Sequence, residues 1–170
     1  MRTPVAELVL DGGLEVVPQS RAFVVEALAD HPDAVTDDLV QPNGGELVSV
    51  VDLQPDQQAP GHARREAREV LRRWQLPSLV DRVVLVVSEL VTNSVRYGRP
   101  PLRLVLTRQQ RCVRVDVHDA VPAEPELRDR RAAPDAETGR GLLIVSAMAD
   151  SVGVEQVPGD GKHVYADFRT

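Results

Sequence analysis

The sequence predicts an α+β fold, a two-layer sandwich whose mixed, mostly antiparallel sheet carries its helices on one face. The first observation is the order of elements after residue 45, which reads strand, helix, helix, two strands, loop, helix, two strands. The second is that short turn sequences join the last two pairs of strands, as in antiparallel hairpins. The third is composition, since 42% of the 170 residues are hydrophobic and only 3% are aromatic. One core built from Val, Leu and Ala is therefore expected.

A turn sequence, QPNGGE at residues 41–46, divides the chain into two parts. Residues 1–45 form an N-terminal extension that faintly resembles the start of the body, which predicts a truncated strand-helix repeat; chance similarity is the alternative. Its apolar stretches, Val5–Leu10 and Phe23–Leu28, are too short to form a core alone. We expect them to cover the body or a second copy, which predicts a homodimer.

The first half of the body begins with a strand at Leu47–Leu53, followed by a helix at Gly61–Trp74 whose apolar residues share one face. A second helix is expected from Pro77 to about Gly98, where Ser78 with Asp81 is close to a capping box. Its apolar positions recur at helical spacing and are Val80, Val83, Val84, Val87, Leu90, Val91 and Val95. Strand is the competing prediction because Val is β-branched, but the length and spacing favour helix.

The second half contains two hairpins around a loop and a helix. Alternating residues predict strands at 102–107 and 113–118, and later at 152–157 and 163–168. A charged, Pro-rich loop spans residues 120–138, and a loop of that length is usually functional. The helix after it, Leu142–Asp150, has four candidate core contacts: Leu142, Ile144, Val145 and Ala149.

Charge and composition exclude several classes of function. The net charge of -6 argues against direct nucleic-acid binding, since an acidic chain repels a phosphate backbone. Cys112 is the single cysteine, and the four histidines lack metal-ligand spacing. The absence of a membrane-length apolar run and of a signal-peptide core predicts a cytoplasmic protein. Of the 20 basic residues all but Lys162 are Arg, which suggests a bacterium with a GC-rich genome.

Glu89 and Asn93 lie four residues apart on the second predicted helix, so they share one face about 6 Å apart along the axis. An Asn oxygen is a hard ligand that suits Mg²⁺ with bound phosphates. A carboxylate beside it can deprotonate a hydroxyl that attacks a phosphoryl group. Taken alone, the pair is more often an ordinary polar helix face.

Two further motifs follow, each weak by itself. Asp119 ends the second strand of the first hairpin, where a carboxylate can accept a hydrogen bond from an adenine amino group, although Asp is common at strand ends. Gly139, Arg140 and Gly141 precede the last predicted helix. Glycines let the backbone approach phosphate, the helix start offers free N–H groups, and Arg can add a phosphate contact.

The ordered set SELVTNSVRYG, VHD and TGRGLLIVSAMAD resembles the small ATP-binding regulators of the GHKL superfamily, which includes histidine-kinase catalytic domains and gyrase-type ATPases. Within it, the chain is most similar to the anti-sigma-factor serine/threonine kinases and their short relatives in high-GC bacteria. The resemblance covers Leu47–Thr170. It implies a histidine-kinase-like ATPase fold and makes residues 46–170 an ATP-binding domain.

The resemblance also implies roles for individual residues. Glu89 would be the catalytic base and Asn93 the Mg²⁺ ligand, with ATP as the nucleotide. The other ATP-binding residues would be Arg96, Asp119, Gly139, Arg140, Gly141 and His163, with His163 at the usual position of a Thr. Residues 123–138 would form a lid over ATP. The partners would be a sigma factor and an antagonist protein that is phosphorylated on Ser or Thr, with no membrane involved.

The chain departs from the family pattern at two places, and the departures leave two functions open. Ala120, Val121 and Pro122 follow Asp119 where small residues, often Gly, are usual. His163 replaces the usual Thr. Glu89 favours a protein serine/threonine kinase, whereas Val121 and His163 favour a non-catalytic ATP-sensing or partner-binding module.

Overall fold

The computed structural model describes residues 47–109, 111–121, 138–157 and 161–170, and these form the predicted α+β sandwich. The elements in chain order are β1 (Leu47–Leu53), α2 (Ala59–Arg73), the 3₁₀ turn η1 (Pro77–Leu79), α3 (Val80–Tyr97), β2 (Leu102–Gln109), β3 (Cys112–Asp119), α4 (Thr138–Met148), β4 (Ser151–Val157) and β5 (Gly161–Arg169). The N-terminal extension and nearly all of the expected lid lie outside the described residues.

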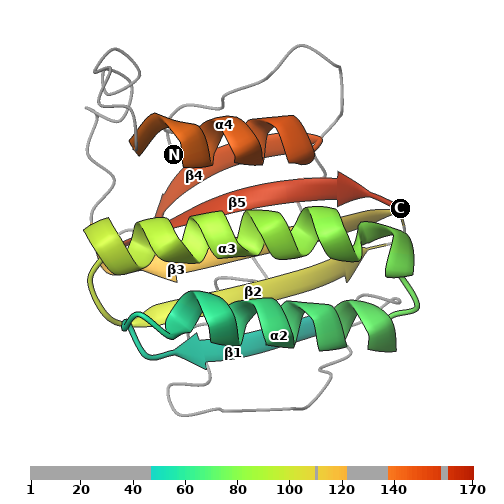
Figure 1. Ribbon diagram of the computed structural model, residues 1–170, viewed down its shortest axis with the longest axis horizontal. Helices are drawn as coiled ribbons and strands as arrows, with labels where there is room; N and C mark the ends of the chain where they lie inside the picture. The colour runs from blue at the N-terminus through green and yellow to red at the C-terminus, as the bar shows by residue number, and fades with distance from the viewer. Residues whose placement is uncertain (1–46, 110, 122–137, 158–160) are drawn as a thin grey trace.

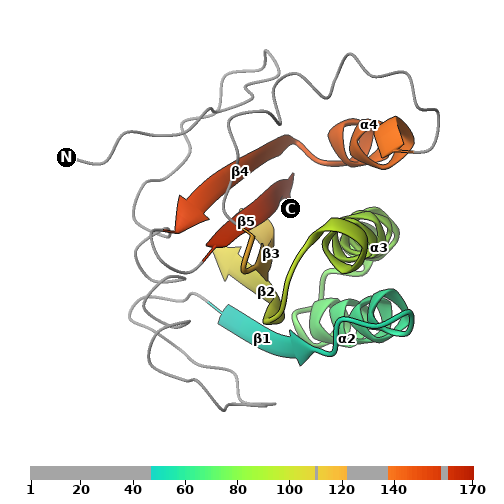
Figure 2. The same ribbon diagram turned by 90° about the vertical axis from the view of Figure 1, so that its left-hand side faces the viewer.

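The described strands form one five-stranded sheet in the order β1-β2-β3-β5-β4, and each neighbouring pair is antiparallel. Helices α2, α3 and α4 lie side by side on one face of this sheet, as Figures 1 and 2 show from two directions. The register places Leu102 opposite Asp119 and Asp119 opposite Lys162. Since directly paired residues share a face, Asp119 and Lys162 lie on the same side of the sheet.

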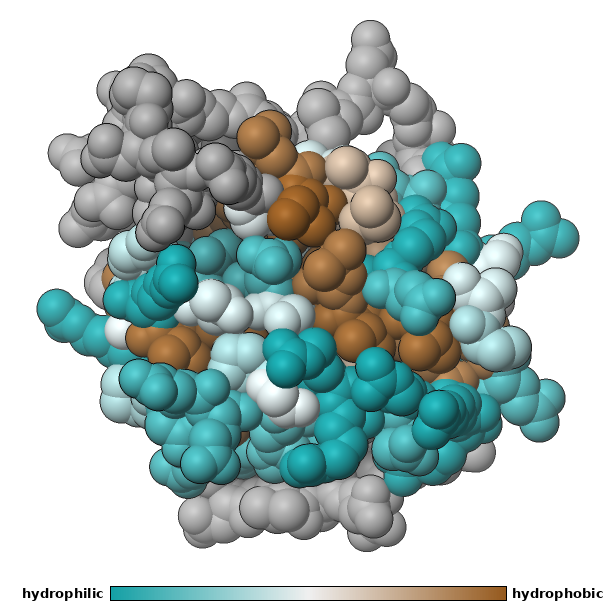
Figure 3. Space-filling view, in the orientation of Figure 1, coloured by the Kyte–Doolittle hydropathy of each residue, from teal (hydrophilic) through white to brown (hydrophobic). Residues whose placement is uncertain are grey.

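The core lies between this face and the three helices. Every second strand residue points into it, because side chains alternate along a strand. The contributing strand residues include Leu104, Leu106, Val113, Val115, Val117, Ala166 and Phe168, and the helices add Ala63, Ala67, Leu71, Val83, Val87 and Val145. Figure 3 shows the outer side of the helix layer, with mostly hydrophilic side chains over α2 and a hydrophobic area higher up. Leu85 of α3 and Leu142 and Leu143 of α4 are exposed. In the part of the chain that the structure describes, no helix could span a membrane.

Three local predictions are wrong. Helix α2 begins two residues early because Asp56 Oδ1 accepts hydrogen bonds from the backbone N–H groups of Gln58 and Ala59. The capping box at Ser78 does not form, since η1 leads directly into α3 and no side chain caps it. Leu142 is 45% exposed, because α4 turns Val145 inward instead.

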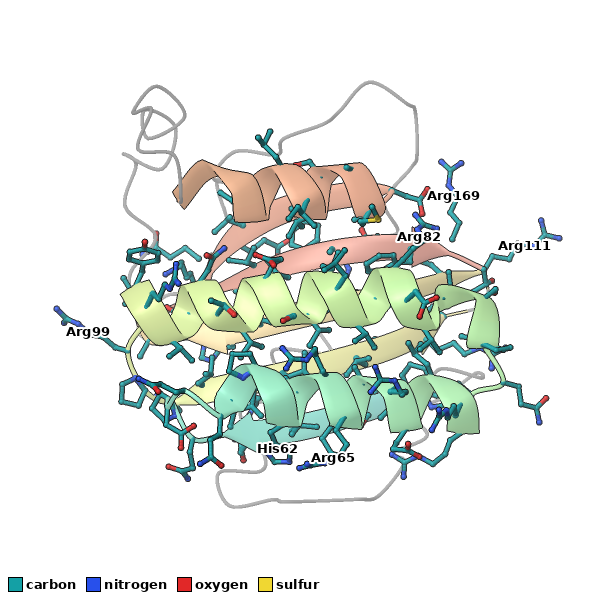
Figure 4. The ribbon with its side chains drawn as sticks, in the orientation of Figure 1. His62, Arg65, Arg82, Arg99, Arg111 and Arg169 are labelled. Carbon is teal, nitrogen blue, oxygen red and sulfur yellow. The ribbon has the colours of Figure 1, made fainter. Side chains whose placement is uncertain are left out.

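Arg82, near the start of α3, fastens the far end of α4. Its Nε donates to the carbonyl oxygen of Met148 at 2.8 Å, and its guanidinium lies 3.4 Å from the Asp150 carboxylate. A cation at a helix C-terminus also interacts favourably with the helix dipole. Figure 4 shows Arg82 and Arg99 at opposite ends of α3. The contact holds α4 along α3, and this alignment positions the other end of α4 for the site below.

Candidate functional site

Glu89 and Asn93 lie half-buried on the side of α3 that faces α4. Their neighbour on α4 is Gly141, which is buried. A Cβ atom at position 141 would lie 2.8 Å from Glu89 Oε2 and 3.8 Å from Asn93 Nδ2. The structure therefore brings three predicted site residues together. Glycine at position 141 leaves room for the Glu89 carboxylate, which a Cβ atom there would crowd. Arg96 continues the same stripe of α3 and is exposed.

The Gly139–Gly141 segment lies inside the first turn of α4, because the helix begins at Thr138 and not after Gly141 as predicted. The first N–H groups of a helix have no intrahelical partner, and the dipole makes this end positive. An anion such as phosphate is therefore favoured at this helix start. The segment reaches the site through its backbone and through Gly141; the side chain of Arg140 lies outside what the structure describes.

Asp119 is the last residue of β3 and is only 1% exposed. Ser94 Oγ of α3 donates to its Oδ2 at 3.0 Å. Its Oδ1 accepts from the backbone N–H of Val121 at 3.1 Å and from Lys162 Nζ at 2.9 Å. Gly98 leaves room for it, since a Cβ there would lie 3.1 Å from the Asp119 Cβ and Cγ atoms. Asp119 thus lies close to the C-terminal end of α3. Its hydrogen-bond partner Ser94 is the residue that follows Asn93 in that helix.

His163 is not brought to this site. It lies on the second face of the sheet, the one opposite α2, α3 and α4, with its Nδ1 3.8 Å from Asp116 Oδ1. Its ring meets that of His118 edge-on, with centroids 5.8 Å apart. Lys162, one residue earlier, takes the position beside Asp119. Counting back in twos from the buried Phe168 would have found this, because alternation puts residue 162 on the core face.

Two residues that contact Asp119, Ser94 and Lys162, were not among the predicted site residues. Ser94 is a polar residue on the buried side of α3, and its spacing from Val87 and Val91 marks it as inward-facing. Lys162 is the only lysine of the chain. Both contact the Asp119 carboxylate, so both belong to the description of the site.

The donor set fits Mg²⁺ held together with a nucleotide. No group of three or more His, Cys, Asp or Glu side chains that could hold a metal occurs among the described residues. Mg²⁺ usually needs no such cage, since one or two protein oxygens plus phosphates and waters complete its octahedron. The amide oxygen of Asn93 would be such a ligand, and the Asn93 side chain lies beside the helix start that favours phosphate. The residues present therefore fit an Mg²⁺-nucleotide better than a bare ion.

Comparison with known proteins agrees with this geometry. The profile of the histidine kinase-like ATPase domain matches residues 53–168, which include all of α2, α3 and α4 and most of the sheet. A comparison with curated proteins gives no match. The matched range holds the acidic and amide pair of α3, the carboxylate at the end of β3 and the glycine of α4. The chain belongs to the histidine kinase-like ATPase family.

Proposed function

We propose that this protein is an ATP-dependent regulator of the anti-sigma-factor type, a serine/threonine kinase that phosphorylates an antagonist protein. The family supports ATP binding in general. The observation that carries the proposal is the meeting of Glu89, Asn93 and Gly141 between α3 and α4, beside a helix start suited to phosphate. A sigma factor and its antagonist are the proposed partners, and the active form is a homodimer.

The roles follow from chemistry and position. Asn93 would hold Mg²⁺ through its amide oxygen, and the Gly139–Gly141 backbone would bind the phosphates. Arg140 and Arg96 would add cationic contacts to the phosphates. Asp119 would accept a hydrogen bond from the base. When bound, Mg²⁺ would neutralise charge on the phosphate oxygens. These groups bind and orient the nucleotide but take no proton.

Glu89 would be the catalytic base. As the hydroxyl oxygen of the incoming Ser or Thr bonds to the γ-phosphorus, the bond to the leaving ADP oxygen breaks and Glu89 accepts the hydroxyl proton. Glu89 lies one helical turn before Asn93, so it can face the γ-phosphate while Asn93 serves the metal. Gly141 keeps the carboxylate in that position by leaving it space.

Nucleotide binding is tested by calorimetric titration of the full chain with ATP and Mg²⁺. Asn93→Ala removes the metal ligand, so affinity for Mg²⁺-ATP is expected to fall at least about tenfold. The matched control is Thr92→Ala, one residue earlier, whose hydroxyl bonds only the Ser88 carbonyl in its own helix. Equal affinity in the wild type and Asn93→Ala would sink the site assignment.

Catalysis is tested with Glu89→Gln, which keeps the shape and removes the charge. We expect nearly unchanged ATP affinity and transfer to a Ser-containing antagonist slowed by roughly 10²- to 10⁴-fold. Glu69→Gln on the outer side of α2 is the control, since among the described residues its carboxylate pairs with the exposed Arg72. Loss of ATP binding in Glu89→Gln would show that Glu89 serves binding or folding and is no base.

A second function is favoured by the hydrogen bonds of Asp119. Asp119 already accepts three hydrogen bonds from within the chain, which weakens its ability to recognise the adenine base of ATP. A non-catalytic module that senses ATP or binds a partner fits this feature. Tight nucleotide binding with no transfer to any antagonist would favour this second function over the kinase.

A further inference from the structure

Lys162 is built into the base end of the site by the register of the sheet. It stands directly opposite Asp119 in the β3–β5 pairing, so both side chains leave the strands on the core face. Gly161 before it has φ +97°, a conformation that favours glycine, and it lies against the Asp119 carbonyl oxygen. The strand start is thus fixed, and Lys162 Nζ is held 2.9 Å from Asp119 Oδ1.

The contact is secluded from water. The Asp119 side chain is 2% exposed and that of Lys162 is 11% exposed. Oδ1 also accepts the Val121 N–H, so both of its lone pairs are used. Oδ2 holds Ser94 Oγ and keeps one lone pair. A base can therefore reach Asp119 only through this last position or by displacing Lys162.

We propose that Lys162 is a specificity-determining residue that lowers the preference for adenine by occupying Oδ1, which leaves the amino group of adenine a single acceptor position on Oδ2. The inference rests on the proposed nucleotide site. The Lys162 ammonium adds a full charge–charge attraction to its hydrogen bond with the carboxylate, which a neutral amino group cannot offer. Lys162 therefore wins the competition for Oδ1, and the protein binds purine nucleoside triphosphates with little regard to the group at position 6.

The test compares three probes by calorimetry with Mg²⁺: ATP, GTP, and purine riboside triphosphate, which carries hydrogen in place of the amino group. The wild type should bind ATP and purine riboside triphosphate within about threefold of each other. Lys162→Met frees Oδ1, so the preference for ATP over both other probes should rise about tenfold, the worth of one hydrogen bond. In an Asp119→Asn background, Lys162→Met should change nothing, which completes a double-mutant cycle.

Two further variants keep the test sharp. Lys162→Met leaves a buried carboxylate without its counter-ion and can lower stability. Lys162→Gln keeps a neutral donor, so it should fold and give an intermediate preference. Arg103→Met removes an ion pair with Asp52 on the second face of the sheet and should leave the preference unchanged. Thermal melting of each variant confirms that the binding data come from folded protein.

The outcomes separate this inference from the proposed function. A wild type that already prefers ATP tenfold over purine riboside triphosphate overturns the inference and leaves ATP binding intact. So does a weaker ATP affinity in Lys162→Gln, which would mean that Lys162 contacts the base itself. If neither the wild type nor any Lys162 variant binds any probe, the proposed nucleotide function fails and the inference falls with it.

Discussion

The two faces of the sheet differ in where their charged residues lie. On the core face, β3 and β5 present apolar residues until their ends, where Asp119 and Lys162 meet under α3. On the second face the same strands present a buried polar cluster: Arg114, Asp116, His118, His163, Tyr165 and Asp167. The comparison teaches that one strand pair can serve a site and a structural network, because neighbouring residues point to opposite sides.

The second face is held by paired groups. Arg114 donates two hydrogen bonds to the Asp167 carboxylate at 2.6 and 2.8 Å, and Ser151 Oγ adds a third at 2.7 Å. The Arg114 guanidinium also lies 4.3 Å from the Tyr165 ring centre, and that ring lies over Gly153. Buried charge is tolerated at this pair because the Arg114 guanidinium and the Asp167 carboxylate bond directly to each other. We therefore expect substitutions on the second face to alter stability. Substitutions of Asp119 and Lys162, at the end of the core face, are expected to alter function.

The largest expected effect comes from breaking the Arg114 pair. Arg114→Met leaves Asp167 buried and without its counter-ion, so the free energy of unfolding should fall by about 3 to 5 kcal/mol. Urea unfolding measures this, and Arg114→Met with Asp167→Leu should recover much of the loss. Nucleotide affinity of the folded single variant should stay at the wild-type value. A large change in that affinity would mean that the two faces are coupled.

The free energy of unfolding is expected to depend on pH through Asp116, which lies on the same face. Burial raises the pKa of Asp116 to about 7, although the positive charge of Arg114 opposes the rise; Asp167 and Glu155 add to it, and His163 lies nearby. In the folded state Asp116 thus keeps a proton that it releases at about pH 4 in the unfolded chain. Its contribution to stability is complete below that pH and is lost as the pH rises through about 7.

Asp116→Asn should remove this loss. The stability difference between the variant and the wild type should grow in favour of the variant from pH 4.5 to 7.5, on the order of 2 to 4 kcal/mol. Urea midpoints at four pH values measure the difference and cancel the titration of other groups. A difference independent of pH would show that Asp116 is ionised throughout the folded state.

Two glycines give a matched comparison of the faces. Gly153→Ala would overlap the Tyr165 ring, so unfolding should become easier by about 1 to 3 kcal/mol with nucleotide affinity unchanged. Gly141→Ala meets only the end of the flexible Glu89 side chain, and alanine favours helix by about 0.5 to 1 kcal/mol. That variant should keep its stability and lose phosphate transfer. Reversed results would exchange the roles assigned to the two faces.

The smallest effect is expected at Arg82. Arg82→Gln removes the hydrogen bond to the Met148 carbonyl, which lies at the end of α4 away from the site. A loss of about 0.5 to 1.5 kcal/mol is expected, with faster hydrogen exchange confined to α4. Exchange that accelerates across the sheet as well would mean that α4 is needed for the whole domain.

Much of the fold could be predicted because each strand alternates and each helix has one apolar face. The strand Leu47–Leu53 and the antiparallel pair of β2 and β3 follow directly from that pattern. Helix ends were less predictable, since the first N–H groups of α2 bond to Asp56 in the preceding loop, and η1 replaces the expected box at Ser78. Such ends depend on the path of the connecting backbone, which composition does not specify.

The candidate site was predictable where it uses helix spacing and less so where it depends on pairing register. Glu89 and Asn93 share a face by periodicity alone. The choice between Lys162 and His163 depends on one residue of register, and a shift by one reverses the face. The helix start at Thr138 could not be read from the glycines, because they permit both a turn and a helix.

The fastening of α4 at one end has a mechanical consequence. Arg82 holds the Met148 end, while Gly141 lies seven residues away, or about 10 Å along the helix. With that end taken as a pivot, the distance sets how far a tilt of α4 would move Gly141 relative to α3. A tilt of about 10° at the pivot would carry Gly141 through roughly 2 Å, on a helix rising 1.5 Å per residue. Such a displacement would exceed the tolerance of a hydrogen bond, so the space left to the Glu89 carboxylate depends on the angle of α4 to within a few degrees.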